Sequence, residues 1–217
     1  MNKFTTKIML GLLVVLLTGL VAIPQSQASA ATILRQGSAN GDVWDLQYRL
    51  QIAGYYTSTI DGHYGRATAN AVRKFQKNYG LPADGITGPA TWKMLKRHTL
   101  NKSEMDIMAR TIYSEARGEP YMGQVAVGAV VMNRIKSDKF PDTIYGVVFQ
   151  SGAFTAVDDG QFWLTPNRTA YLAAQDAVRG WDPTNGSLYY FNPDTATSAW
   201  IWSRKQNVII GKHIFAS

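Results

Sequence analysis

The clearest amphipathic pattern in the chain leads up to Glu115. Met105, Met108 and Ile112 lie ten, seven and three residues before it, and these offsets fall on one face of an α-helix. Because that face turns toward a core, the carboxyl group stands in line with a buried stripe. Burial disfavours the charged form of a carboxylic acid, so the position suits a group that donates a proton. A solvated surface glutamate is the ordinary alternative.

The helix that carries this stripe has recognisable ends. Ser103 is predicted to be its N-cap, with Asp106 at the capping-box position, and Gly118 is predicted to end it. Two other acidic residues of the segment, Glu104 and Glu119, are expected to be ordinary surface residues.

The pattern after this helix predicts more helix and then a small β region. Gly123–Met132 is almost free of charge and predicts a short buried helix, although its valines leave a strand open. Thr165 is predicted to cap a further helix whose alanines at positions 170, 174 and 177 face inward. The tail, with short apolar runs at 208–210 and 213–216, predicts a β-hairpin or irregular lobe.

The first part of the chain contains an internal repeat. Residues 61–68 read D-G-H-Y-G-R-A-T and residues 84–91 read D-G-I-T-G-P-A-T. Each copy is an Asp-Gly turn that runs into a helical pattern. An earlier helix places Val43, Leu46 and Leu50 on one face. Residues 33–97 are therefore predicted to form a three-helix module, and residues 103–217 a second domain, in a mainly α fold with a small β part.

The first residues of the chain predict an exported protein. Lys3 and Lys7 precede the apolar run Ile8–Ile23, and Ala28–Ala31 follows, which is the order of a secretory signal peptide over residues 1–30. An uncleaved segment would instead allow membrane association. The whole chain carries a net charge of +7. Loss of residues 1–30 leaves +5, which suits an anionic wall polymer better than nucleic acid in an exported protein. The absence of cysteine excludes thiol chemistry.

The module resembles the three-helix peptidoglycan-binding domain of many wall hydrolases. Phe75 and Trp92 are expected in its core, while Tyr55, Tyr56 and Tyr64 lie in turn-like stretches and are expected to stack on sugar rings. The resemblance also suggests a wall-binding role for Asp61, Gly62 and Gln76. The positions that carry the resemblance are Val43, Leu46, Gln47, Leu50, Gly54, Asp61, Gly62, Tyr64, Gly65, Thr68, Ala71, Val72, Phe75, Gln76, Leu81, Asp84, Gly85, Gly88, Thr91 and Leu95.

From about Ser103 to the end, the sequence resembles the spore cortex-lytic enzyme and germination cell-wall hydrolase family. The resemblance implies a lysozyme-like fold, with Glu115 as the essential residue. It also implies cleavage of the glycan strand between N-acetylmuramic acid and N-acetylglucosamine by lytic transglycosylases, in spore cortex or vegetative wall. The motifs are S-E-A-R-G-E-P (114–120), G-Q-V-A-V (123–127), N-R (133–134), F-P (140–141), A-F-T-A-V (153–157), D-G-Q (159–161), W-D-P (181–183), L-Y-Y-F-N-P (188–193), S-x-W-I-W-S-R (198–204) and I-G-K-H-I-F (210–215).

The number of carboxylates separates two mechanisms. A hydrolysing glycosidase generally needs two carboxyl groups, whereas a lytic transglycosylase can use one as acid and then as base. Asp158 and Asp159 are the candidates for a second carboxylate, although a turn is their more ordinary role. Thr155, Gln161, Tyr189 and Asn192 are predicted to position the sugar, and the further candidates to line its groove are Trp163, Tyr190 and Trp200.

Two other functions stay open. A zinc amidase needs about three protein ligands, but His213 is the one histidine after residue 102, and no H-E-x-x-H motif occurs. No metal or cofactor is therefore expected. A non-catalytic wall-binding protein is the other alternative. The expected location is the cell wall, the spore cortex or the surface of the inner spore membrane.

Overall fold

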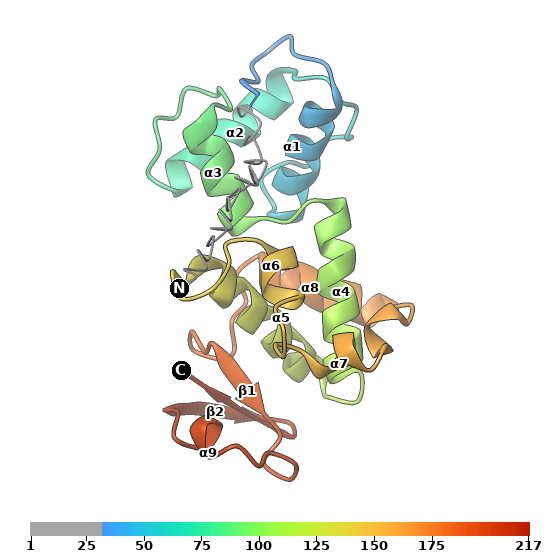
Figure 1. Cartoon of the computed structure of the whole chain (residues 1–217). Coiled ribbons are helices and arrows are strands. Elements are labelled where there is room, and N and C mark those ends of the chain that lie inside the picture. The colour runs from blue at the N-terminus through green and yellow to red at the C-terminus, as the bar shows by residue number, and fades with distance from the viewer. Residues whose placement is uncertain (1–31) are drawn as a thin grey trace, which may run out of the picture. The chain divides into compact units, whose positions relative to one another are not determined.

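The computed structural model describes residues 32–217, which lie within one compact unit of the chain; the predicted signal peptide lies outside the described residues. Helices dominate, and a three-stranded sheet ends the chain (Figure 1), so the predicted mainly α class is confirmed. No helix within 32–217 is long and apolar enough to cross a membrane. In chain order the elements are α1 Gly41–Ile52, α2 Arg66–Asn78, α3 Pro89–His98, α4 Lys102–Ala116, α5 Tyr121–Lys136, α6 Ile144–Val148, α7 Thr155–Asp158, the 3-10 helix η1 Gln161–Trp163, α8 Arg168–Val178, β1 Tyr189–Phe191, α9 Ala199–Trp202, β2 Gln206–Ile210 and β3 His213–Ala216.

Helices α1, α2 and α3 close around their own apolar core. Leu46 and Leu50 of α1 are fully buried there with Phe75 of α2 and Leu95 of α3. Trp92 joins this core, and its indole N–H donates to the carbonyl of Thr32. The predicted inward faces of these helices, including Phe75 and Trp92, are confirmed.

A buried glutamine holds the first Asp-Gly turn. The Gln47 amide N–H of α1 donates to Asp61 Oδ1 at 2.8 Å, and its carbonyl oxygen accepts the N–H of Gly62 at 2.9 Å. The same amide group also donates to the hydroxyl of Thr68 at 3.1 Å. Asp61 and Gly62 are therefore parts of the frame of this turn.

The second turn repeats this arrangement. Gln76 of α2 donates to Asp84 Oδ1 at 2.8 Å and accepts the N–H of Gly85 at 2.9 Å. Backbone donation from Ile86, together with the Gln76 bond, lowers the pKa of Asp84 below its ordinary value. Gln76 is 1% exposed, so its side chain is committed inside the protein. The sequence repeat therefore encodes the same hydrogen-bonding arrangement twice. The burial of Gln76 corrects the expectation that it contacts the wall.

The predicted sugar-stacking tyrosines differ in accessibility. Tyr64 is 1% exposed, and its hydroxyl donates to the carbonyl of Gly85 at 2.7 Å. Its ring has no face open to a sugar, because the second turn covers it, so the structure corrects this expectation. Tyr56 is 5% exposed, and its hydroxyl donates to the carbonyl of Thr59 at 2.8 Å, so it is also a core residue. Tyr55 is half-buried and meets Phe75 edge-on, with 5.4 Å between ring centroids.

Helices α4, α5 and α8 build the second core. The predicted buried helix is α5, which is longer at both ends than its charge-free stretch, and Val125, Val127 and Val131 are all fully buried. Gly128 permits close packing here, since a Cβ atom at this position would lie 2.9 Å from Ala177 of α8. The buried faces of α4 and α8 therefore meet on a helix that is enclosed on most sides.

Two helix starts differ from the predicted ones. α4 begins after Asn101, whose side chain accepts the N–H of Glu104 at 2.8 Å, while the Glu104 carboxylate accepts the N–H of Asn101 at 2.7 Å. Ser103 was expected in that role but lies inside the helix. α8 likewise begins after Asn167 rather than Thr165. In both cases an asparagine two residues away forms the cap, and asparagine is at least as favourable there as serine or threonine.

The chain ends in an antiparallel sheet of strand order β1-β3-β2. Tyr190 of β1 is opposite Phe215 of β3. Phe215 and Ile210 pack with Ala126 and Val130 of α5 in a third apolar cluster. The predicted hairpin is present, and β1 adds a third strand that the tail pattern did not resolve.

Arg49 of α1 binds the start of α4. Its guanidinium is 2% exposed; it donates to the carbonyl of Thr99 at 2.9 Å and lies 2.9 Å from the Glu104 carboxylate. Glu104 is thus both a capping residue and an ion-pair partner, not the free surface residue expected from the sequence.

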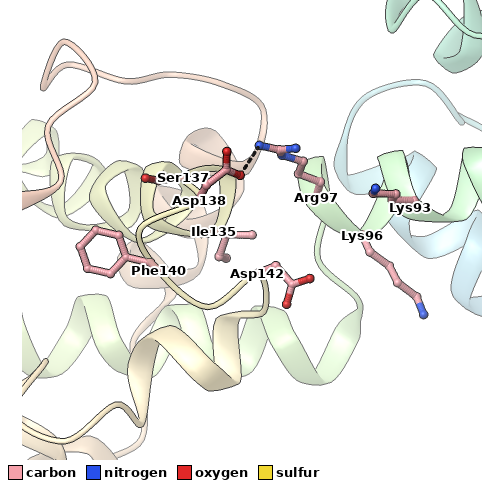
Figure 2. Close-up of a pocket in the computed structure, with 8 residues that line it drawn as sticks. All are labelled: Lys93, Lys96, Arg97, Ile135, Ser137, Asp138, Phe140 and Asp142. Carbon is pink, nitrogen blue, oxygen red and sulfur yellow. Dashed lines mark ion pairs between the residues drawn. The ribbon is translucent and has the colours of Figure 1, made fainter. Parts of the chain in front are cut away.

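Cationic residues of α3 line a hollow of about 340 Å³ beside the loop that follows α5. Figure 2 shows Arg97 pointing toward Asp138. The distance between Arg97 Nη2 and Asp138 Oδ1 is 3.9 Å. Both of these side chains are largely exposed, so the pair contributes little to stability. The lining residues are Lys93, Lys96, Arg97, Ile135, Ser137, Asp138, Phe140 and Asp142.

We predict that Gln76→Leu destabilises the protein by about 2–4 kcal/mol, because it leaves the buried N–H of Gly85 without its acceptor and removes one of the two donors to Asp84. Urea denaturation followed by tryptophan fluorescence measures the change. Gln51→Leu is the matched control, because Gln51 donates only one exposed bond, to the carbonyl of Ser58. Equal losses from both variants would contradict the framework role of Gln76.

Candidate active site

Glu115 lies in the last turn of α4, as the apolar stripe predicts. Met105, Met108 and Ile112 are 4%, 0% and 0% exposed, whereas Glu115 itself is half-buried. The helix ends at Ala116, and the chain turns through Gly118 before α5 begins. The carboxyl group therefore projects from a rigid core helix without being sealed inside it.

Both oxygens of the Glu115 carboxyl group have donors from distant parts of the chain. The Tyr190 hydroxyl of β1 donates to Oε2 at 2.9 Å, and the N–H of Ala156 donates to Oε1 at 3.3 Å. These donors come from the sheet and from the segment at α7, so three separate elements fix the orientation of one carboxyl group.

The surroundings of Tyr190 keep its hydroxyl protonated. Burial, and next the negative charge of Glu115, raise the pKa of Tyr190 well above its ordinary value. Its ring packs on Phe215, with centroids 5.8 Å apart, and meets His213 edge-on at 5.3 Å. Tyr190 is therefore a fixed hydrogen-bond donor over the whole range in which a carboxyl group titrates.

Arg134 of α5 supplies positive charge near this pair. Its side chain is 8% exposed, and Nε donates to the carbonyl of Leu188 at 2.8 Å. The guanidinium also lies over the rings of Phe140 and Tyr189, at 5.1 and 5.8 Å from their centroids. Burial lowers the pKa of Arg134, an effect opposed by Tyr190, Tyr189 and Glu115. The cation is therefore fixed in place by rings and a carbonyl.

A groove of about 390 Å³ opens beside Tyr190. Tyr189 and Trp200 form one wall, with ring centroids 5.1 Å apart and planes nearly perpendicular. Trp200 is 51% exposed, so an indole face is available to a sugar ring. No described residue of the lining is Asp or Glu; it consists of Arg134, Phe140, Gln150, Ser151, Gly152, Ala153, Tyr189, Tyr190, Ser198, Trp200 and Ile201.

The predicted sugar-positioning residues do not all lie in this groove. Tyr189 lines it, whereas Gln161 is held in a loop, donating to Asp159 at 2.7 Å and accepting from Arg117 at 2.8 Å. The Asn192 side chain accepts the N–H of Asp194, which is an ordinary turn contact. Thr155 begins α7, and its side chain lies outside the described residues.

Of the two candidates for a second carboxylate, Asp159 has the turn role that was its more ordinary alternative. Asp159 accepts both the backbone and the side-chain N–H of Gln161, which matches the turn role. The side chain of Asp158 is outside the described part of the chain. Trp163, a further groove candidate, is 68% exposed on η1 and is not among the described lining residues.

Sequence reasoning did not single out Arg134 or His213 as parts of the site. Arg134 had a visible signal, because it is the first charged residue after the apolar run of α5. His213 lies in the motif at 210–215, but the motif does not place it beside Tyr190, because that position depends on strand pairing. Among the side chains that the structure describes, which exclude that of Asp158, no three of His, Cys, Asp or Glu gather as a metal site would require.

Known proteins share both parts of the chain. A family model described as cell wall hydrolase matches residues 118–216, and a model described as peptidoglycan binding domain matches residues 39–95. The spore cortex-lytic enzyme of Bacillus cereus is 43% identical and is matched over 92% of each chain. That of Bacillus subtilis is 36% identical, over 84% of this chain and 88% of the relative.

Solved structures match the second part. The catalytic domain of a germination-specific lytic transglycosylase, SleB from Bacillus anthracis, is 58% identical with a TM-score of 0.53, covering 54% of this chain and 97% of that one. The catalytic domain of Bacillus cereus SleB is 59% identical with a TM-score of 0.52, over 54% and 91% of the two chains. Since relatives above 30% identity span most of its length, the chain belongs to the family of spore cortex-lytic enzymes.

Proposed function

We propose that this protein is a peptidoglycan lytic transglycosylase in which Glu115 is the single acid and base. The observation that carries the proposal is a carboxyl group held by two donors, the Tyr190 hydroxyl and the N–H of Ala156. Tyr190 also lines the groove, and none of the described lining residues is Asp or Glu. Its Bacillus anthracis relative is a germination-specific lytic transglycosylase, which supports the same chemistry. The polymer acted on is peptidoglycan, as indicated by the family membership and by the match of residues 39–95 to a peptidoglycan binding domain.

The reaction needs two proton transfers, both through the same carboxyl group. Protonated Glu115 gives its proton to the glycosidic oxygen as the bond from muramic acid C1 breaks, and N-acetylglucosamine leaves as an alcohol. The resulting carboxylate then takes the proton of the muramic acid C6 hydroxyl, whose oxygen bonds to C1. The product is a 1,6-anhydro ring, no water is consumed, and Glu115 returns to its starting form.

Each neighbour has a distinct part in this cycle. Tyr190 and the N–H of Ala156 orient the carboxyl group and can stabilise its charge in the middle of the cycle, when it has lost its proton. Tyr189 and Trp200 offer aromatic faces to the sugar.

The first part of the chain provides attachment rather than chemistry in this proposal. We assign wall binding to a module at residues 33–97 and catalysis to a domain at 103–217. We further propose that residues 1–30 direct export, so that the enzyme acts in the wall or the spore cortex, with membrane association if that segment is retained. Among the predicted wall-binding residues, half-buried Tyr55 keeps a surface that could contact glycan.

We predict that Glu115→Gln abolishes release of fragments from purified sacculi, with a loss of at least about 10³-fold, because the proton donor is removed. Mass spectrometry of the products from cortex and from vegetative sacculi is the measurement. Wild-type protein should give anhydro-muramic ends, and the preferred sacculus identifies the natural substrate.

Other products would contradict the proposal in different ways. Reducing muramic ends would mean hydrolysis with a second carboxylate, and free stem peptides on intact glycan would mean an amidase. Binding without any release by the wild-type chain would mean a wall-binding protein.

We predict that Tyr190→Phe lowers kcat by roughly 10- to 100-fold, as expected for loss of a hydrogen bond to a charged group worth about 1.5–3 kcal/mol. The KM for soluble glycan strands should change little, because the ring remains in the groove. Tyr121→Phe is the matched control, since it also removes a tyrosine–carboxylate bond, to Asp176 at 2.6 Å, within the packing of α5 and α8. A Tyr190→Phe enzyme with wild-type kcat would remove Tyr190 from the mechanism.

A further inference from the structure

A second glutamate of the same segment is buried against the sheet. The Glu119 side chain is 7% exposed, contrary to the sequence-based expectation of a surface residue. Its Oε2 accepts the N–H of Lys212, in the turn between β2 and β3, at 3.0 Å. Its Oε1 lies 3.8 Å from Nδ1 of His213, the first residue of β3. Glu119 is thus attached to the sheet 93 residues further along the chain.

Two glycines, Gly211 and Gly123, allow the backbone to pack closely against the Glu119 side chain. A Cβ atom at Gly211 would lie 1.9 Å from Glu119 Oε2, and Gly211 has a φ of +59°. A Cβ atom at Gly123, on the other side, would lie 3.0 Å from the Glu119 Cβ. A side chain at Gly211 would therefore displace the carboxylate from the turn.

His213 connects this anchor to the active site. Its ring meets the Tyr190 ring edge-on at 5.3 Å, and its side chain is 13% exposed. Burial lowers the pKa of His213, while the negative charges of Glu119 and Glu115 oppose that shift. The ring is therefore a packing partner for Tyr190 on the side that faces Glu119.

Strand pairing links the Glu119 anchor to the Tyr190–Glu115 hydrogen bond. β3 begins at His213 and pairs with β1, where Phe215 is opposite Tyr190 and Ile214 is opposite Phe191. Tyr190 donates to Glu115, and only the end of α4 and a short turn separate Glu115 from Glu119 along the chain. The sheet is thus held at two points, one at the end of α4 through Tyr190 and Glu115, and the other at the turn between α4 and α5 through Glu119.

We propose that Glu119 is a positioning residue for catalysis: by binding the β2–β3 turn it fixes β3, and through β3 it holds the Tyr190 hydroxyl on Glu115. This inference rests on the proposed function of Glu115. Glu119 acts as a hydrogen-bond acceptor and does not touch the substrate, because its side chain is only 7% exposed and its carboxylate accepts the N–H of Lys212.

The test compares Glu119→Ala with Glu119→Gln in the full chain. The alanine variant should lose roughly 10- to 100-fold in kcat with little change in KM, because misplacement of a catalytic group by about 1 Å has effects of this size. The glutamine variant keeps an oxygen that can accept the Lys212 N–H and should retain most of the activity.

Glu104→Ala is the matched control for loss of stability. Glu104 is an acidic residue at the other end of α4, with a backbone N–H and Arg49 as partners. The Glu104→Ala variant should have a lower melting temperature but a kcat near the wild-type value, measured at a temperature where the protein stays folded.

A double-mutant cycle with Tyr190→Phe separates positioning from general weakening. If Glu119 acts through Tyr190, Glu119→Ala should cost less than about 3-fold in the Tyr190→Phe background. Independent losses that multiply would overturn the proposal, and so would full activity of Glu119→Ala. If Glu119→Ala does not fold, Gly211→Ala, which displaces the carboxylate, replaces it in the same cycle with the same expected outcome.

These experiments distinguish failure of the Glu119 proposal from failure of the proposed function. A wild-type chain that releases no anhydro fragments would remove the function itself. A wild-type chain that releases them, with Glu119→Ala equally active, would remove only the role of Glu119.

Discussion

The hydrogen bond from Tyr190 to Glu115 is the contact on which the candidate site depends, because it joins the terminal sheet to the helix that carries the carboxyl group. Either element alone would leave the carboxyl group with fewer fixed partners. The helix supplies rigidity through its buried stripe, and the sheet supplies a donor whose proton stays in place because burial and Glu115 raise the pKa of Tyr190. A group that must be acid and base in turn needs such a setting, since any rotation of the carboxyl group between the two proton transfers would separate it from the reacting oxygen.

The first three helices solve a different problem, that of stabilising a small core without cysteine. Two buried glutamines each satisfy an Asp-Gly turn through both ends of the side-chain amide. Because each amide donates and accepts inside the protein, its burial leaves no unpaired group. The residues that make the module's sequence recognisable are therefore largely those that hold it together, and the surface that meets the wall must be sought among less distinctive positions such as Tyr55.

How far the sequence predicts this molecule depends on the range of the interactions involved. The stripe before Glu115 and the inward alanines of α8 were predictable, because helical spacing is local. The caps were missed by two residues, since Asn101 and Ser103, like Asn167 and Thr165, share the same capping chemistry. The burial of Glu119 and Tyr64 was not predictable, because their partners lie 93 and 21 residues away and nothing local marks them. For the same reason Glu115 could be chosen from the sequence, whereas its contact with Tyr190 could not.

The source of the oxygen in each new muramic end tests the single-carboxylate account most directly. Wild-type enzyme would digest sacculi in water enriched in ¹⁸O, and the fragments would be analysed by mass spectrometry before exchange. The account predicts no solvent oxygen in the new ends, since the C6 hydroxyl of the same sugar closes the ring on C1. Incorporation of one ¹⁸O atom at each cut would contradict it, because water would then be the attacking group and a second catalytic base would be required.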